Sequence, residues 1–294
     1  MANLTDNNGK RREGGISGYG LGGVDTVLSV DDVARQAEEL SGDTPSGETL
    51  SQLVNGDTLL SIDGLVSGYG KMEVIHGFDL RIGAGQSLCL IGPNGAGKST
   101  ILHSIYGFTN IMGGRISMRG QDVTNLNPNE KLKNAGIAYI LQDNSVFPDM
   151  SVEENLLMGG FLKDHPRDAE EAAEQVLERY PRLKERRAQN AGVLSGGERR
   201  LLEISRALIM NPDILLVDEP SIGLEPRYID MVFEILADLQ YTDGKTIIMV
   251  EQNAKKGLEF SDIGYVLVSG SLAMAGEGDA LLESEDVGRL FLGG

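Results

Sequence analysis

The sequence has no tryptophan, only one cysteine and few aromatic residues, which make up 5% of the chain. A single cysteine cannot form an intramolecular disulfide, so a small disulfide-stapled secreted scaffold is excluded. The longest apolar runs, such as residues 214–217, are about four residues long, far below the roughly 20 that span a bilayer. No apolar stretch of the secretory-signal type follows Met1. We therefore expect a soluble, cytoplasmic protein.

Basic residues are also scarce relative to acidic ones. There are 26 Lys and Arg against 44 Asp and Glu, which gives a formal charge of −18 and a pI of about 4.6. This balance argues against broad attraction to nucleic-acid phosphates or anionic lipid headgroups, so no nucleic-acid partner is expected. The acidity has two open explanations, adaptation to a salty cytoplasm and an ordinary acidic bias.

The 294 residues are enough to bury a large core, but the amino-acid composition of the chain changes near residue 57. Residues 1–56 are polar and glycine-rich, so we expect an acidic, poorly ordered extension with at most one short helix near residues 29–40. Later segments alternate between strand and helix patterns, which favours an α/β fold with a parallel sheet. A terminal hairpin is also expected. The expected strands are 60–65, 78–82, 87–91, 137–141, 214–217 and 246–250, a helix-rich stretch covers 151–187, and the hairpin covers 265–275.

A glycine-rich loop of the form G-x-x-x-x-G-K-[ST] directly follows the apolar strand 87–91 and opens a predicted helix. In this context, backbone N–H groups and the helix N-terminus surround phosphates, Lys98 reaches the β- and γ-phosphates, and the Ser99 hydroxyl ligates Mg²⁺. The loop therefore predicts nucleotide binding. Its residues are Gly92, Pro93, Asn94, Gly95, Ala96, Gly97, Lys98, Ser99 and Thr100.

Two carboxylates, Asp218 and Glu219, end the apolar strand 214–217. At the tip of a strand in a parallel sheet, Asp218 is placed to hold Mg²⁺, and Glu219 to orient and polarise the attacking water. A helix-start loop is the alternative for such a sequence taken alone. A phosphate loop upstream favours the catalytic interpretation.

A third segment, Leu-Ser-Gly-Gly-Glu, enters another predicted helix and could simply be a capping box. Together with the phosphate loop and the Asp-Glu pair, in this order and at this spacing, it resembles the nucleotide-binding subunit of the ATP-binding cassette (ABC) family over about residues 58–282. The resemblance implies a P-loop NTPase of the ABC ATPase type, with a RecA-like parallel-sheet core, an N-terminal antiparallel β part and an inserted α-helical subdomain. The domain would cover 57–294, with its catalytic core at 57–142 and 195–282 and its helical subdomain at about 143–194.

The resemblance also implies roles for individual residues. Tyr69 would stack on adenine, and Gln142 would touch Mg²⁺ and link the ATP core to the helical subdomain. Gln252 stands where most members have histidine, so its amide would contact the γ-phosphate beside the catalytic Lys98 and Glu219. The implied metal site comprises Ser99, Gln142 and Asp218. The signature residues would act on ATP bound by a second subunit, and they are Ser195, Gly196, Gly197 and Glu198.

Four further segments narrow the resemblance to the ATPase subunits of branched-chain amino acid importers or their urea and amide relatives. These segments are 146–156, 221–224, 250–253 and 264–267. The implied cofactors are ATP and Mg²⁺. The implied partners are a second, different ATPase subunit, two transmembrane permease subunits and a solute-binding protein, at the inner face of the cell membrane.

The sequence differs from the usual pattern of the family at two further places, and one alternative function is considered. The run Gln142-Asp-Asn144 differs from the Glu-Gly-Arg that these importer subunits often carry there, which leaves the solute open. Glu225 stands where the subunit-bridging loop usually has aspartate. The alternative function is a soluble ABC ATPase of a remodelling or assembly type, but no long coiled coil, tandem cassette or basic surface is evident.

Overall fold

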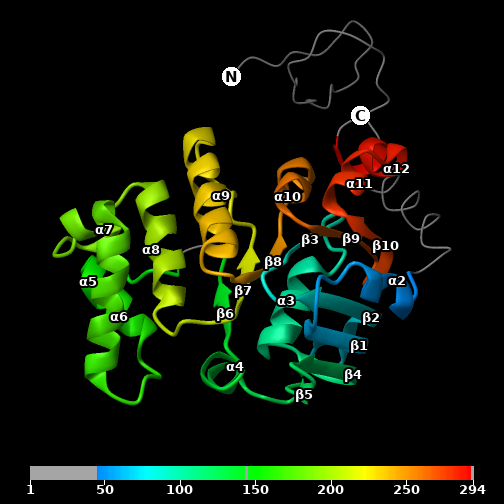
Figure 1. The fold of residues 1–294 in the computed structure, drawn as a ribbon, viewed down its shortest axis with the longest axis horizontal. Coiled ribbons are helices and arrows are strands. Elements are labelled where there is room, and N and C mark those ends of the chain that lie inside the picture. Colours follow the sequence, from blue (N-terminus) through cyan, green and yellow to red (C-terminus); the bar gives the residue numbers. More distant parts are fainter. Residues whose placement is uncertain (1–44, 143–144, 293–294) are drawn as a thin grey trace, which may run out of the picture.

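A computed structural model of the protein describes residues 45–142 and 145–292. Figure 1 shows two regions side by side, a β-rich body and a group of helices beyond the edge of its larger sheet. Within the described residues, no helix is long and apolar enough to cross a membrane. The α/β architecture predicted from the sequence is confirmed, with parallel and antiparallel sheets in the same body.

The smaller sheet has the order β2-β1-β4-β5. All of its strand pairs are antiparallel, which confirms the expected antiparallel β part. Its long strands alternate buried apolar residues with exposed ones, as expected when one face is covered. The strands are β1 (Thr58–Tyr69), β2 (Met72–Gly83), β4 (Asn110–Met118) and β5 (Gln121–Asp122).

The larger sheet has the order β10-β9-β3-β8-β7-β6. From β9 to β6 the neighbouring strands are parallel, and β10 pairs antiparallel with β9 to form the predicted C-terminal hairpin. Strands β3, β7 and β8 are buried along their whole length, which explains their continuous apolar sequences. The strands are β3 (Ser87–Ile91), β6 (Ile137–Ile140), β7 (Ile214–Asp218), β8 (Thr246–Val250), β9 (Ile263–Val268) and β10 (Ser271–Glu277).

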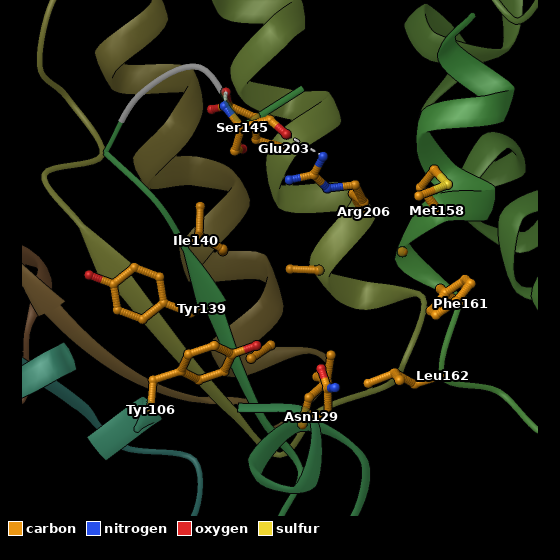
Figure 2. A pocket seen from close by; sticks show the side chains of 14 residues that line it. Tyr106, Asn129, Tyr139, Ile140, Ser145, Met158, Phe161, Leu162, Glu203 and Arg206 are labelled. Carbon is orange, nitrogen blue, oxygen red and sulfur yellow. Dashed lines mark hydrogen bonds between the residues drawn. The ribbon is translucent and has the colours of Figure 1, made fainter. Parts of the chain in front are cut away.

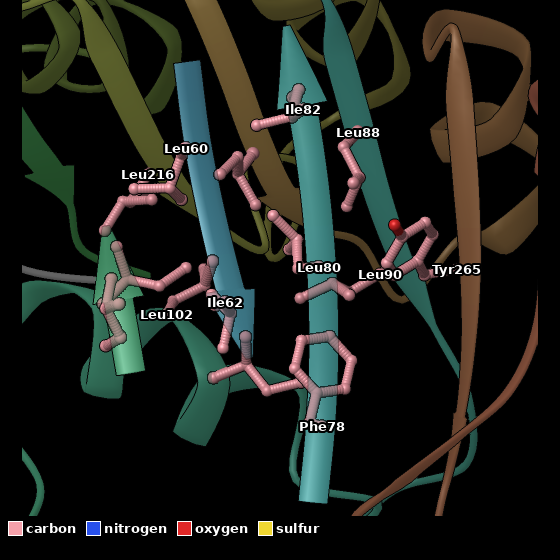
Figure 3. Close-up of a cluster of buried hydrophobic side chains, with 14 of the residues drawn as sticks. Leu60, Ile62, Phe78, Leu80, Ile82, Leu88, Leu90, Leu102, Leu216 and Tyr265 are labelled. Atoms are coloured by element: carbon pink, nitrogen blue, oxygen red, sulfur yellow. The ribbon is translucent and has the colours of Figure 1, made fainter. Parts of the chain in front are cut away.

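Two apolar cores cover the two faces of the larger sheet. One core lies between this sheet, the smaller sheet and helix α3 (Lys98–Tyr106). Figure 3 shows side chains of β2 facing Leu88, Leu90 and Tyr265, and Leu60 of β1 beside Leu216. The other core joins the opposite face to α9 and α10. The remaining helices of the body are α4 (Pro128–Lys133), α9 (Pro226–Tyr241), α10 (Ala254–Phe260), α11 (Gly278–Leu282), α12 (Glu285–Val287) and the π-helix η3 (Gly288–Leu292).

The helical subdomain has its own apolar core, formed mainly by residues between Val146 and Ile209. Helix α8 (Gly196–Leu208) belongs to both parts, because Leu201 and Leu202 join the helical core while Ile204 joins the core of the body. Helix α8 therefore packs on both the predicted helical subdomain and the predicted catalytic core. The other helices are α5 (Val152–Gly159), α6 (Pro166–Arg179), α7 (Pro181–Glu185) and the short η2 (Ala191–Val193).

The expected end of the N-terminal extension at residue 56 needs correction. Helix α2 (Gly47–Gln52) lies before that point and buries Leu50 completely in the core of the body. The Gln86 side chain also donates to Leu53 O at 3.0 Å and accepts from Asn55 N at 3.0 Å. The folded domain therefore begins before residue 57. The short helix predicted near residues 29–40 lies outside the described residues.

Candidate functional site

The phosphate loop leaves the buried strand β3 and enters α3 through Gly97, the N-cap residue. Gly97 has φ +98°, in the left-handed region that favours glycine. A Cβ atom there would lie 2.7 Å from Ile75 Cδ1, so the end of the Ile75 side chain on β2 would also have to shift. The helix N-terminus and the loop amides are thus oriented as an anion-binding site.

Lys98 folds back over the loop. Its Nζ donates to the carbonyl oxygens of Gly92 at 2.9 Å and Pro93 at 3.0 Å, and the residue is only 8% exposed. Burial lowers the pKa of Lys98, while the nearby Glu219 and Asp218 oppose that shift. The ammonium group is therefore held beside the loop and within reach of the carboxylates at the end of β7.

Asp218 is a buried carboxylate at this edge of the sheet, with 5% of its surface exposed. Its Oδ1 accepts a hydrogen bond from Ser99 Oγ at 3.0 Å, although the two residues lie 119 positions apart. A hydroxyl and a carboxylate oxygen in contact are hard oxygen ligands of the kind that Mg²⁺ prefers. The donor set at this position therefore fits the predicted metal, with Ser99 and Asp218 as its two protein groups.

Glu219 adopts a left-handed backbone conformation with φ +43°, which is uncommon for a residue other than glycine. Its N–H donates to Val250 O at 2.8 Å and ties this turn to the end of β8. The Gln142 amide donates to Glu219 Oε2 at 2.7 Å. The structure thus brings together two predicted site residues from the ends of β6 and β7.

A cavity of about 310 Å³ opens over the phosphate loop. Tyr69 is 42% exposed at its rim, and its hydroxyl is 2.5 Å from Nδ1 of His103. Three residues of this region were not predicted from the sequence: His103, Met72 and Val74. Met72 and Val74 lie on β2 and form part of the cavity wall. The lining residues are Tyr69, Met72, Val74, Asn94, Gly95, Gly97, Lys98, Ser99, Thr100 and Glu219.

The signature segment does not line this cavity. Ser195 and Glu198 form the capping box that was the alternative interpretation, with Ser195 Oγ accepting from Glu198 N at 3.3 Å. A Cβ atom on Gly197 would lie 2.2 Å from the Tyr228 ring, so glycine is required for the packing of α8 on α9. Gln252 follows β8 as an exposed residue and is likewise absent from the cavity lining.

A buried ion pair on α8, between Arg200 and Glu203, holds the chain on both sides of residues 143–144. This pair was not predicted from the sequence. Arg200 Nη1 donates to Leu141 O at 2.7 Å and to Glu203 Oε2 at 2.9 Å. Glu203 Oε1 in turn accepts from Ser145 N at 3.2 Å, and Arg206 donates to Ser145 O. An Arg and a Glu three residues apart on an otherwise apolar helix face is the signal that could have predicted this pair.

A second cavity of about 350 Å³ separates the larger sheet from the helical subdomain. Figure 2 shows Tyr106, Tyr139 and Ile140 on the sheet side and Met158, Phe161 and Leu162 on the helical side. Phe161 is 80% exposed and Met158 is 41% exposed, so apolar surface gathers at the rim. Such an exposed apolar rim is typical of a site for another protein.

A family model and individual relatives both match this chain, and they describe the same kind of protein. Residues 75–222 match the family described as ABC transporter. The high-affinity branched-chain amino acid transport ATP-binding protein BraG of Pseudomonas aeruginosa is 42% identical, over 80% of this chain and all of that protein. The probable branched-chain amino acid transport ATP-binding protein LivF of Archaeoglobus fulgidus is 35% identical, over 78% of this chain and 96% of that protein.

Solved structures agree with these sequence relatives. The ADP conformation of an ATP-binding cassette of an ABC transporter superposes with a TM-score of 0.71 at 30% identity, and covers 81% of this chain and all of that chain. A nucleotide-free cassette gives the same TM-score at 28% identity. The matched region includes the phosphate loop, the signature segment, Asp218 at the end of β7 and the following Glu219. The chain therefore belongs to the ABC transporter family, as an ATP-binding and ATP-hydrolysing subunit.

Proposed function

We propose that this subunit drives an importer for branched-chain amino acids or a related small amide or urea solute, by hydrolysing ATP between two cassettes. The observation that carries the hydrolysis part of the proposal is the convergence of five side chains at one edge of the parallel sheet, those of Lys98, Ser99, Asp218, Glu219 and Gln142. This edge holds a phosphate site, a metal site and a carboxylate for water. Those three groups are what ATP hydrolysis requires. The importer part is supported by the similarity to branched-chain amino acid transport ATP-binding proteins.

Each of these residues has a distinct role in the reaction. Lys98 and the loop amides bind the phosphates, and Tyr69 stacks on the adenine at the cavity rim. Ser99 and Asp218 would hold Mg²⁺, with Gln142 beside them, and the ion would supply positive charge against the charge that develops on the phosphates. Glu219 orients the water that attacks the γ-phosphorus, accepts its proton, and is itself held by the amide of Gln142. ADP and inorganic phosphate are the products.

A second cassette supplies the remaining contacts. The cavity over the phosphate loop has no signature residue in its lining, and the N-terminal turn of α8 exposes Gly196. A helix N-terminus favours an anion, so Ser195, Gly196, Gly197 and Glu198 of each subunit would face the γ-phosphate bound by the other. Gln252 would donate its amide to the same phosphate. We propose that the partner is a different ATPase subunit.

The cavity of Figure 2 is the proposed contact with the permease subunits. Its lining includes Ile140 and Ser145, which stand on either side of Gln142 in the sequence, and Glu203, which accepts from Ser145 N. A permease segment in the cavity would touch both the sheet and the helical subdomain. We propose that closure of the two cassettes reaches the membrane by this route, at its cytoplasmic face, with a solute-binding protein completing the complex.

The decisive experiment is Glu219→Gln. The amide keeps the shape of the side chain but cannot accept the proton of water, so we expect unchanged ATP affinity, loss of turnover and a stable ATP-bound dimer. ATP binding by fluorescence, steady-state phosphate release and gel filtration with ATP report the three effects. Glu171→Gln, on the exposed face of α6, is the matched control and should behave as wild type.

Turnover close to wild type in Glu219→Gln would contradict the assignment of Glu219. The transport part is tested separately in the assembled complex, where solute-loaded binding protein should stimulate hydrolysis. Leucine, urea and a short aliphatic amide are compared as solutes. Stimulation by none of the three would contradict the proposed solute class.

A further inference from the structure

The Asp218 carboxylate is held from two sides. Ser99 Oγ donates to Oδ1 at 3.0 Å, and the phenol of Tyr139 donates to Oδ2 at 2.8 Å. Asp218 is 5% exposed, so these bonds are shielded from water. The Tyr139 bond joins residues 79 positions apart, and the sequence gives no motif for it.

Tyr139 is itself fixed by its surroundings. It lies on β6, where it pairs with Leu216 of the neighbouring β7, and its hydroxyl points away from Glu203 and Arg206 in Figure 2. Its ring centroid lies 5.4 Å from Tyr106, 5.7 Å from His103 and 5.8 Å from Phe108. This aromatic cluster limits the positions that the hydroxyl can take.

The direction of this bond is set by the geometry: the Tyr139 hydroxyl donates, and Asp218 Oδ2 accepts. A hydrogen bond to a charged acceptor is stronger than one between neutral groups.

We propose that Tyr139 is a positioning residue for Asp218: its hydroxyl holds Oδ2 so that Oδ1, with Ser99, faces the metal. The proposal rests on the proposed function, in which Asp218 holds Mg²⁺. Hydrogen-bonded partners of metal-ligating carboxylates typically contribute 10- to 100-fold to metal affinity or activity. Tyr139 would supply such a contribution without touching the metal or the nucleotide.

The test is Tyr139→Phe, which keeps the ring and removes only the hydroxyl. We expect the affinity of the ATP-loaded protein for Mn²⁺, measured by electron paramagnetic resonance, to fall about tenfold. ATP affinity in EDTA should stay at the wild-type value, because the phosphate loop is untouched. The control is Tyr180→Phe, since the buried Tyr180 hydroxyl has no hydrogen-bond partner, and Mn²⁺ affinity should not change there.

A second variant separates positioning from a merely structural role. In an Asp218→Asn background, adding Tyr139→Phe should cause no further loss of Mn²⁺ affinity, because the hydroxyl acts through the carboxylate. Equal losses in both backgrounds, or unchanged Mn²⁺ affinity in Tyr139→Phe, would overturn the positioning role alone. If the ATP-loaded wild-type protein bound no Mn²⁺, the metal assignment of the proposed function would fail, and this inference with it.

Discussion

Replacing Arg200 with methionine should destabilise the fold strongly, because it leaves the Glu203 carboxylate buried without its cation. Arg200 is 4% exposed and Glu203 is 5% exposed, and Nη1 and Oε2 are 2.9 Å apart. Removing one partner of a buried pair costs about 3–5 kcal/mol, and the loss includes the bond to Leu141 O. Since a folded domain has only about 5–15 kcal/mol in total, we expect a large drop in the free energy of unfolding.

The assay is a double-mutant cycle measured by urea denaturation at 25 °C. The variants are Arg200→Met, Glu203→Leu and the double substitution, and the free energy of unfolding is compared for each. The double variant leaves neither charge alone, so its loss should be smaller than the sum of the single losses by at least about 2 kcal/mol. The control is Arg167→Met, whose partner Glu171 lies on the surface of α6, and it should stay within about 0.5 kcal/mol of wild type.

Two results would refute this reasoning. A cost below about 1 kcal/mol for Arg200→Met would mean that water reaches the Glu203 carboxylate in spite of its burial. Strict additivity in the cycle would mean that the two side chains do not depend on each other. Either result would also remove the argument that α8 fixes the chain on both sides of residues 143–144.

Two predictions remain. Leu50→Ala should lower the free energy of unfolding by about 2–5 kcal/mol, because Leu50 is fully buried in the core, and chemical denaturation should show no comparable loss for the exposed Gln52→Ala on the same helix. Gln252→His should raise steady-state ATP hydrolysis of the assembled complex several-fold and Gln252→Ala should lower it, since a protonated imidazole donates a charge-assisted hydrogen bond. Equal rates in all three proteins would show that Gln252 does not contact the γ-phosphate.

The parts of the site that the sequence predicted are those that follow buried strands. Continuous apolar runs mark β3 and β7, and parallel strands meet at one edge, so Lys98 and Asp218 had to come close. The capping box at Ser195 was also readable, because both of its partners lie within one helical turn. Local patterns of this kind need no knowledge of the tertiary structure.

The parts that the sequence did not predict depend on contacts across the fold. Tyr139 reaches Asp218 only because β6 and β7 are neighbours, an order that alternation of strands and helices does not determine. Leu50 was assigned to a loose extension because one leucine in a polar stretch carries no periodic signal. The pairing of Gln142 with Glu219 likewise required the positions of two strand ends.

The left-handed backbone at Glu219 has a consequence for protein engineering. For a residue with a Cβ atom this conformation costs roughly 1–2 kcal/mol, a cost that glycine would avoid. Selection of variants for heat resistance alone should therefore enrich glycine at this position, in proteins that fold better and no longer turn over ATP. A library of variants at position 219 that is screened for stability would therefore also have to be screened for ATP hydrolysis.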